Sequence, residues 1–244
     1  MHIYIYDYFL NQKKYDKIVA KIETRITDLG LQGKNCHVGP LKSLKSIVTE
    51  ELKNNPTTII AIGDNKTLNE VVNAAKDSNI IIGIIPIGNN NSIADTLGIT
   101  DEDQACNVLS ARLIERIDIG VINNNYFIAN AKIATQGTVM EINGKYTIEP
   151  TGDGEVEIIN LNTSTQNSKI NPNDGLFEIF INVNQKKLMS STNEQSFIQT
   201  NRVIINNLKH NQFLIDNAVE IPTPVEIGVI KNKLSVIVGK ERGF

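Results

Sequence analysis

Two short polar turns stand where this sequence could bind a phosphate group. The first is Gly63-Asp64-Asn65-Lys66-Thr67, after the apolar run 57–62, and the second is Gly88-Asn89-Asn90-Asn91, after the apolar run 80–87. Each apolar run predicts a buried strand, and a helical pattern follows each turn. In a parallel sheet such turns share one edge, where the backbone N–H groups of helix N-termini attract anions.

Each turn also has a purely structural interpretation. Thr67 and Glu70 fit the capping-box pattern Thr-x-x-Glu. Asn91 or Ser92 could simply cap the next helix, and asparagine suits tight loops because it tolerates left-handed backbone conformations. Taken alone, each turn is more typical of a helix cap. Two such turns on adjacent strands, however, favour a ligand site.

The elements that must position these turns alternate along the first half of the chain. Strands are expected over residues 3–6, 57–62 and 80–85, and helices over 15–29, 41–52, 68–75 and 93–97. This alternation predicts a doubly wound parallel sheet. Arg112 and Arg116 are expected to share one face of a further helix.

After Asp118 the sequence changes to short apolar runs separated by Asn, Gly and Pro, which is typical of an antiparallel β-sandwich. Residues 151–154 are expected to form a hairpin turn between two of these strands. We therefore predict an α/β domain over residues 1–121 and a β-sandwich domain over residues 122–244.

The composition excludes several classes of protein. The chain has 244 residues, 24 Lys plus Arg, 27 Asp plus Glu and a formal net charge of -3, which is typical of a globular protein. Cys36 and Cys106 are too few for a disulfide framework or a zinc site. The sequence has no block of basic residues that would predict a nucleic-acid partner. Its longest apolar run is also far shorter than the roughly 20 residues of a transmembrane helix. With no signal-peptide pattern, we expect a cytoplasmic protein.

The order of the motifs resembles the catalytic domain of diacylglycerol and sphingosine kinases, including the bacterial lipid kinases. The family signature reads Gly-Gly-Asp-Gly-Thr-x-Asn-Glu-Val, followed by Pro-x-Gly-Thr-x-Asn-Asp. The matching residues are Gly63, Asp64, Thr67, Asn69, Glu70 and Val71, and then Pro86, Gly88 and Asn91. Residues 117–127, 171–178 and 215–227 resemble later segments in the same order, so the resemblance covers nearly the whole chain.

The sequence also departs from the family pattern. Ile62 replaces the first glycine, Asn65-Lys66 stands in place of another, and Asn89 replaces a threonine. Residues 6–11 replace the family's Asn-Pro-x-x-Gly loop, and the usual helical insertion between residues 133 and 146 is missing. Where relatives have Asp-Gly-Glu, this chain has Asp216-Asn217-Ala218, so the acidic base is lost unless Asp216 or Glu220 serves.

The resemblance implies an ATP-dependent kinase that phosphorylates a lipid hydroxyl at a membrane surface, with Mg²⁺. Phosphoryl transfer needs charge neutralisation and a carboxylate near the acceptor, and Asp64 and Asp216 are the candidates. Either one could instead be an ordinary turn residue. We expect Lys66 to contact phosphate, Asp64 to hold the metal and Asp216 to lie nearest the acceptor hydroxyl. The expected nucleotide-binding residues are Gly63, Asp64, Asn65, Lys66, Thr67, Asn69, Gly88, Asn89, Asn90 and Asn91.

The resemblance further implies a structural Mg²⁺ at Asp174, with backbone carbonyls near Asn171 and Leu176, and an ordinary Asp-Gly turn is an equally good interpretation. The lost glycines and the lost acid leave a second functional interpretation open. In it the chain is a non-catalytic relative, a pseudokinase, that binds a nucleotide, a lipid or a protein partner. The sequence also leaves a homodimer open.

Overall fold

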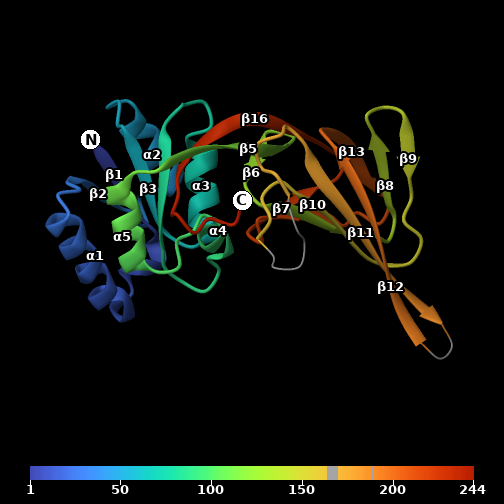
Figure 1. Cartoon of the computed structure of the whole chain (residues 1–244), viewed down its shortest axis with the longest axis horizontal. Helices are drawn as coiled ribbons and strands as arrows, with labels where there is room; N and C mark the ends of the chain where they lie inside the picture. Colours follow the sequence, from blue (N-terminus) through green and yellow to red (C-terminus); the bar gives the residue numbers. More distant parts are fainter. Residues whose placement is uncertain (164–169, 188–189) are drawn as a thin grey trace. The chain divides into compact units, whose positions relative to one another are not determined.

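The computed structural model describes residues 1–163, 170–187 and 190–244, which form two compact units (Figure 1). Unit 1 comprises Met1–Ile117 and Lys233–Gly243, and unit 2 comprises Asp118–Asn232 with Phe244. The chain passes between the units within two strands, β5 (Ile114–Ile122) and β16 (Val225–Ile237). The expected division after residue 121 places residues 233–243 in the second domain, whereas the last part of β16 belongs to unit 1. In the sequence, the apolar runs 225–230 and 234–238 indicate two short strands. In the structure they belong to the single strand β16.

Unit 1 contains a parallel sheet in the order β2, β1, β3, β4 and the last part of β16. Tyr6 lies opposite both His37 and Ile62, and Gly63 lies opposite Pro86, so these strands end at a common carboxyl edge. The predicted doubly wound domain is confirmed. Its first four strands are β1 (His2–Tyr6), β2 (Gly33–His37), β3 (Thr58–Gly63) and β4 (Ile81–Pro86).

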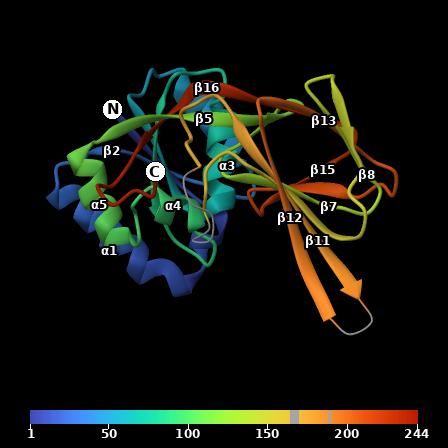
Figure 2. The ribbon, with the colours of Figure 1, turned by 45° about the vertical axis from the view of Figure 1, so that its right-hand side comes forward.

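Helices cover the sheet on two sides (Figures 1 and 2). One pair in contact is α1 (Asp16–Asp28) with α5 (Glu102–Ala111), and another is α2 (Leu44–Leu52) with α3 (Asn65–Ala74). The short α4 (Ser92–Thr96) packs on α3 and β4, and the 3-10 helices η1 (Tyr8–Asn11) and η2 (Lys13–Tyr15) follow β1. Within the described residues, no helix is long and apolar enough to cross a bilayer.

Two sequence-based expectations about helices are wrong. Helix α2 begins at Leu44 because the Ser43 hydroxyl accepts a hydrogen bond from the Ser46 amide, which leaves Leu41 in a turn. Helix α5 ends at Ala111, where Arg112 takes a left-handed conformation (φ 53°) and its guanidinium donates to Thr58 Oγ1 at 3.0 Å. Arg116 lies in β5, so the two arginines share no helical face.

Unit 2 is the predicted β-sandwich. One antiparallel sheet has the order β12, β11, β10, β7, β14, β15, and the first part of β16 pairs with β13, which continues through β8 to β9. Side chains from both sheets, including Met140, Phe177, Val203 and Phe213, share one core. The remaining strands are β6 (Asn125–Phe127), β7 (Asn130–Ala134), β8 (Thr138–Ile142), β9 (Tyr146–Ile148), β10 (Asp153–Ile159), β11 (Phe177–Lys187), β12 (Ser190–Thr200), β13 (Arg202–Asn207), β14 (Gln212–Ile215) and β15 (Val219–Pro222).

The predicted hairpin at residues 151–154 is not formed. Strand β9 pairs with β8, whereas β10 pairs with β7 and β11, so residues 151–154 connect strands of different sheets. The Gly-rich segment that predicted a hairpin is therefore the connection between the two sheets of the sandwich.

Candidate functional site

The carboxyl edge of the unit 1 sheet brings the two polar turns together. The Ile87 amide donates to the Gly63 carbonyl at 2.9 Å, and the Asn65 amide donates to the Asn90 carbonyl at 2.8 Å. The turns that follow β3 and β4 are therefore joined by backbone hydrogen bonds, as their placement on adjacent strands predicts.

Asn65 is the side chain that holds this pair of turns in place. It is 1% exposed, and its Nδ2 donates to Asn90 Oδ1 and to Ser92 Oγ, both at 3.0 Å. Its Oδ1 accepts from the Ile93 amide at 3.2 Å. Because the polar groups of Asn65 are bonded inside the protein, this residue supports the turns rather than facing a ligand.

Asp64 caps helix α3. Its Oδ1 accepts from the amides of Lys66 (3.0 Å) and Thr67 (3.2 Å), and Thr67 Oγ1 accepts from the Asp64 amide (3.2 Å). The capping box is therefore Asp64 with Thr67, not Thr67 with Glu70, and the helix begins three residues earlier than expected. Gly63 permits this arrangement, because a Cβ at that position would overlap the Thr67 side chain.

The cap has a direct consequence for phosphate binding. The first four amides of α3 all have acceptors: Asn90 O for Asn65, Asp64 Oδ1 for Lys66 and Thr67, and Asp64 O for Leu68. A helix N-terminus usually attracts anions through such amides when they lack partners. Here a phosphate could reach the Lys66 and Thr67 amides only if Asp64 released them.

Two further carboxylates, those of Asp7 and Glu70, and the Lys66 ammonium group lie near this cap. Thr67 Oγ1 donates to Asp7 Oδ2 at 2.6 Å, and Lys66 Nζ lies 4.0 Å from Glu70 Oε1. Burial raises the pKa of Glu70, Lys66 lowers it, and the charges of Asp7 and Asp64 raise it further. No motif in the sequence predicts Asp7 as a site residue. Its position directly after β1 is the signal that could have found it, since the same rule selected Asp64.

The ten predicted nucleotide-binding residues divide into three groups by exposure. Lys66, Gly88 and Asn89 are exposed, and Asp64, Asn90 and Asn91 are half-buried. The other four, Gly63, Asn65, Thr67 and Asn69, are buried within the framework. Gly88 has a φ of 109°, which favours glycine, and a Cβ there would lie 3.9 Å from Asp64 Oδ2. A ligand at this edge would therefore meet Asp64, Lys66, Gly88 and Asn89.

The donor set suits Mg²⁺ bound with a nucleotide better than a metal held by protein alone. Among the described residues, no three His, Cys, Asp or Glu side chains are arranged to hold a metal ion. Asp64 Oδ2 makes no hydrogen bond within the described part of the chain, and it faces the same side as Gly88. Mg²⁺ typically takes one or two carboxylates and completes its shell with water and phosphate oxygens.

A separate hollow of about 340 Å³ lies beside η1. It is lined by Leu10, Asn11, Asp16, Val19, Ala20, Glu23 and His37. None of the predicted nucleotide-binding residues lines it. The phosphate-binding prediction therefore gains no support from this hollow.

The double role of Asp64 gives a testable expectation. Asp64→Ala removes the acceptor of two helix amides and should lower the free energy of unfolding by about 1–2 kcal/mol. Asp64→Asn should stay within about 0.5 kcal/mol of the parent, because asparagine caps helices as well as aspartate does. Urea denaturation followed by circular dichroism measures both. Equal stability of Asp64→Ala and the parent would contradict the assigned cap.

In unit 2, Asp216 is an anchor for the backbone of residues 128–130. It is 1% exposed, Oδ2 accepts from the Ile128 amide at 2.8 Å, and Oδ1 accepts from the amides of Ala129 (2.8 Å) and Asn130 (3.1 Å). Three backbone donors stabilise an ionised carboxylate and fix its position. These contacts make Asp216 an anchor of this backbone segment, and its place nearest the acceptor hydroxyl stays a prediction.

Asp174, Asn171 and Leu176 lie in one loop of unit 2. Asp174 Oδ1 accepts from the Leu176 amide at 2.9 Å, and Asn171 Oδ1 accepts from the Asn173 amide at 3.1 Å. Buried Asp118 anchors the loop by accepting from the Gly175 amide at 2.6 Å. Lys231 Nζ donates to the Asp174 carbonyl at 3.4 Å, and this ammonium opposes a second cation there.

Comparison with known proteins agrees with the order of motifs. Residues 3–122 match the model of the diacylglycerol kinase catalytic domain. A diacylglycerol kinase of Bacillus subtilis (strain 168) is 41% identical over 88 residues, which cover 34% of this chain and 28% of that protein. A diacylglycerol kinase of Staphylococcus saprophyticus is 40% identical over 80 residues, which cover 32% of this chain and 26% of that protein. The chain thus spans about a quarter of the length of these relatives in the alignments.

The structural comparison covers both units. A crystal structure of a diacylglycerol kinase from Bacillus anthracis str. Sterne superposes with a TM-score of 0.80 and 16% identity, over 99% of this chain and 97% of that one. The parallel sheet of unit 1 and the β-sandwich of unit 2 therefore have the fold of that diacylglycerol kinase. The first half of the chain is thus similar to the diacylglycerol kinase catalytic domain, and the whole chain shares the fold of the Bacillus anthracis protein.

Proposed function

We propose that this protein is an ATP-dependent lipid kinase that transfers a phosphoryl group to the hydroxyl of a diacylglycerol-like lipid. The observation that carries the proposal is the pairing of the two family turns at one sheet edge, with Asp64, Lys66, Gly88 and Asn89 toward the open side. The match of residues 3–122 to the diacylglycerol kinase catalytic domain supports the reaction class.

Lys66 is the proposed contact to the nucleotide phosphates. A lysine in the first turn of a helix opposes the helix dipole at a cost of about 0.3–1 kcal/mol, and a bound anion would remove that conflict. The side chain is 60% exposed and its Glu70 pairing distance is 4.0 Å, so little is lost when it turns to a phosphate. In this proposal the Lys66 ammonium group binds the phosphate in place of the helix amides, which are already bonded to Asp64.

Asp64 and Gly88 complete the proposed phosphate site. Asp64 Oδ2 would contribute to binding Mg²⁺, which neutralises phosphate charge when bound. Gly88 has no Cβ beside that oxygen and leaves room for a ligand. This division of Asp64, with one oxygen for the helix cap and one for the metal, keeps the turn rigid while the nucleotide binds.

The altered Asp216-Asn217-Ala218 segment is compatible with transfer. Phosphoryl transfer depends mainly on positioning and on charge neutralisation, and it places little demand on a strong base. We propose that Asp216 acts through the backbone of residues 128–130 as a positioning residue. The acceptor hydroxyl would then lose its proton late in the reaction to an oxygen of the transferred phosphoryl group, as the hydroxyl becomes more acidic.

Nucleotide titration tests the proposal. Lys66→Ala should weaken binding of Mg-ATP by roughly tenfold or more in calorimetry, because a charge-assisted contact contributes about 1.5–3 kcal/mol. Lys53→Ala, which removes another exposed lysine of unit 1, should bind as the parent does. If the parent binds no nucleotide at millimolar concentration, or if Lys66→Ala binds equally well, the kinase proposal falls and a non-catalytic relative remains.

Transfer itself is measured with radiolabelled ATP and diacylglycerol in mixed micelles. The parent should form a labelled lipid. Asp64→Asn should fold normally and lose most of this activity, since the amide retains the cap and binds Mg²⁺ poorly. An Asp64→Asn variant with full activity would exclude this carboxylate from the metal site.

A further inference from the structure

Two loops at the carboxyl edge of unit 1 expose apolar side chains to solvent. We call residues 8–15, which follow β1, the first loop, and residues 38–46, which follow β2, the second loop. Leu41 of the second loop is 99% exposed and Tyr8 of the first is 54% exposed. Burying the fully exposed Leu41 side chain on a partner would remove apolar surface from water and stabilise the complex.

The second loop is a closed turn rather than a loose segment. The Gly39 amide donates to the Lys42 carbonyl and the Lys42 amide donates to the Gly39 carbonyl, both at 3.2 Å. Ser43 then caps α2 through the Ser46 amide. These bonds hold Pro40 and Leu41 at the tip, so little conformational entropy is lost when the tip meets a partner.

Hydrogen bonds also tie the two loops to each other. The Val38 amide donates to the Tyr6 carbonyl at 3.0 Å, and Asn11 Nδ2 donates to the Val38 carbonyl at 2.9 Å. Tyr8 and Leu41 therefore belong to neighbouring segments of one surface, which we call the loop surface.

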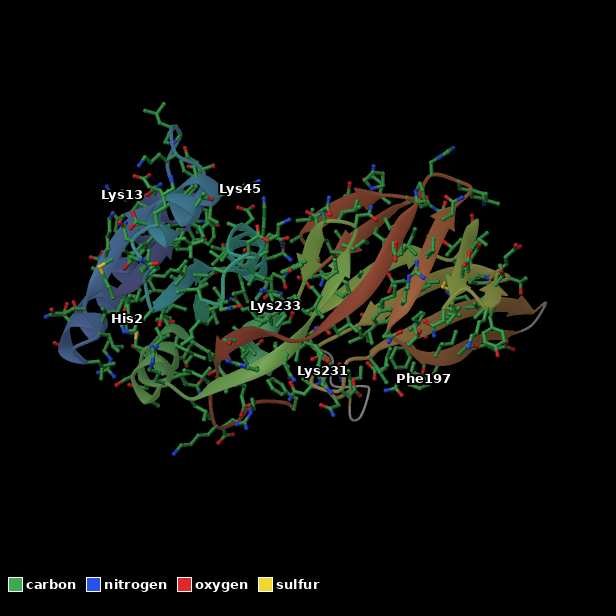
Figure 3. All side chains as sticks on the ribbon, turned by 90° about the horizontal axis from the view of Figure 1, so that it is seen from above. His2, Lys13, Lys45, Phe197, Lys231 and Lys233 are labelled. Carbon is green, nitrogen blue, oxygen red and sulfur yellow. The ribbon has the colours of Figure 1, made fainter. Side chains whose placement is uncertain are left out.

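The loop surface is basic although the chain is acidic. Its two segments contain Lys13, Lys14, Lys42 and Lys45 and no Asp or Glu, whereas the chain has 27 acidic and 24 basic residues. Lys42 pairs with Glu50, and Lys14 lies 4.8 Å above the Tyr15 ring. Lys13 and Lys45 are exposed, form none of the ion pairs found among the described residues, and lie toward the same side of unit 1 (Figure 3).

We propose that the loop surface docks on an anionic lipid bilayer, with Leu41 entering the interface and Lys13 and Lys45 facing the lipid headgroups. An exposed aliphatic tip with flanking lysines matches the two forces that hold peripheral proteins on membranes, apolar burial and attraction to anionic lipids. An acidic protein partner would satisfy the lysines but would not require Leu41 to enter hydrocarbon. The choice of a membrane rests on the proposed lipid kinase function.

The absence of tryptophan in the sequence provides a direct reporter. Leu41→Trp introduces a single tryptophan at the tip, and Leu208→Trp introduces one at a leucine of unit 2 that is 68% exposed. With phosphatidylcholine vesicles that contain phosphatidylglycerol, the emission of Leu41→Trp should shift to shorter wavelength and be quenched by brominated lipid. Leu208→Trp should show neither effect. If the Leu41→Trp variant binds the vesicles and its tryptophan emission is unchanged, the proposal is overturned.

Vesicle sedimentation measures the affinity. Leu41→Ser should weaken binding about tenfold, and Lys13→Gln with Lys45→Gln should weaken it by more than tenfold, with a smaller dependence on salt. Leu208→Ser should bind as the parent does. Equal binding by Leu41→Ser, equal binding to vesicles of phosphatidylcholine alone, or no vesicle binding by the parent would each overturn the proposal.

These vesicles contain no diacylglycerol, and the assays contain no nucleotide. If the protein binds Mg-ATP and phosphorylates micellar lipid but does not bind vesicles, the proposed kinase function stands and the membrane-docking proposal falls. A protein that docks on vesicles but binds no nucleotide would lose the kinase function alone.

Discussion

Replacing Asp216 by alanine should lower the free energy of unfolding of unit 2 by about 3–5 kcal/mol. The carboxylate is buried and accepts from the amides of Ile128, Ala129 and Asn130. Alanine leaves three buried donors without an acceptor, and each such group costs about 1–3 kcal/mol before relaxation. This loss approaches the whole stability of a typical domain.

Hydrogen exchange measures this effect at the amides concerned. The amides of residues 128–130 should exchange much faster in Asp216→Ala, and urea denaturation should show an earlier transition. The free energy of unfolding of Asp216→Asn should lie between those of the parent and of Asp216→Ala. Asparagine keeps the acceptor Oδ1, but its NH₂ group meets the Ile128 amide. Glu220→Gln, a change at an exposed carboxylate of the adjoining strand, is the control and should stay within about 0.5 kcal/mol. Unchanged stability with lost activity would instead assign Asp216 to the chemistry.

The second large effect concerns Glu178 and pH. Burial raises the pKa of Glu178 to about 7 from 4.5, the charge of Asp174 adds to the rise, and Gln199 opposes it through a hydrogen bond. The side chain is 4% exposed, and Oε2 has no hydrogen-bond partner among the described residues. The folded state thus binds a proton that the unfolded state releases. The contribution of this group to the free energy of unfolding should be fully present below about pH 4.5 and should fall by about 3 kcal/mol as the pH rises to about 7.

Glu178→Gln tests this linkage. The variant should lose the decline between pH 4.5 and 7 and should exceed the parent in stability above pH 7, as measured by urea denaturation in metal-free buffer with EDTA. Asp174→Asn should make the decline smaller, because it removes the second cause of the shift. Glu220→Gln should keep the full decline. A parent with constant stability over this range would show that the Glu178 carboxyl reaches solvent.

The parallel sheet was predictable because its central strands are buried on both faces. Strands β3 and β4 read as continuous apolar runs, and continuous runs between helical patterns identify such strands. Strand β2 has the sequence Gly-Lys-Asn-Cys-His and is largely exposed at the edge of the sheet, so no pattern indicated it. Its pairing with β1 comes from the backbone, which all residue types share.

The candidate site was predictable in position and not in its hydrogen bonds. Strand ends followed by polar turns located Asp64 and Gly88. The α3 amides bond to Asp64 because its backbone is extended, and to Asn90 because the turn after β4 lies beside the start of α3. Neither condition can be read from the local sequence. Asp216 bonds to residues 86 to 88 positions earlier in the sequence, and no local pattern contains such a pairing.

Strand β16 determines when unit 1 can be completed during synthesis. Ser235 and Val236 pair with Ile81 and Ile82, about 150 residues earlier in the sequence. At about 5–20 residues per second, a ribosome needs roughly 8 to 30 seconds to make the intervening chain. Until β16 pairs, one edge of the six-residue apolar strand β4 lacks its partner, and unpaired apolar edges can template aggregation. The parallel sheet that carries the candidate site therefore gains its last strand only after nearly the whole described chain has been made, and we expect its yield in the cell to rise with the speed at which β16 pairs.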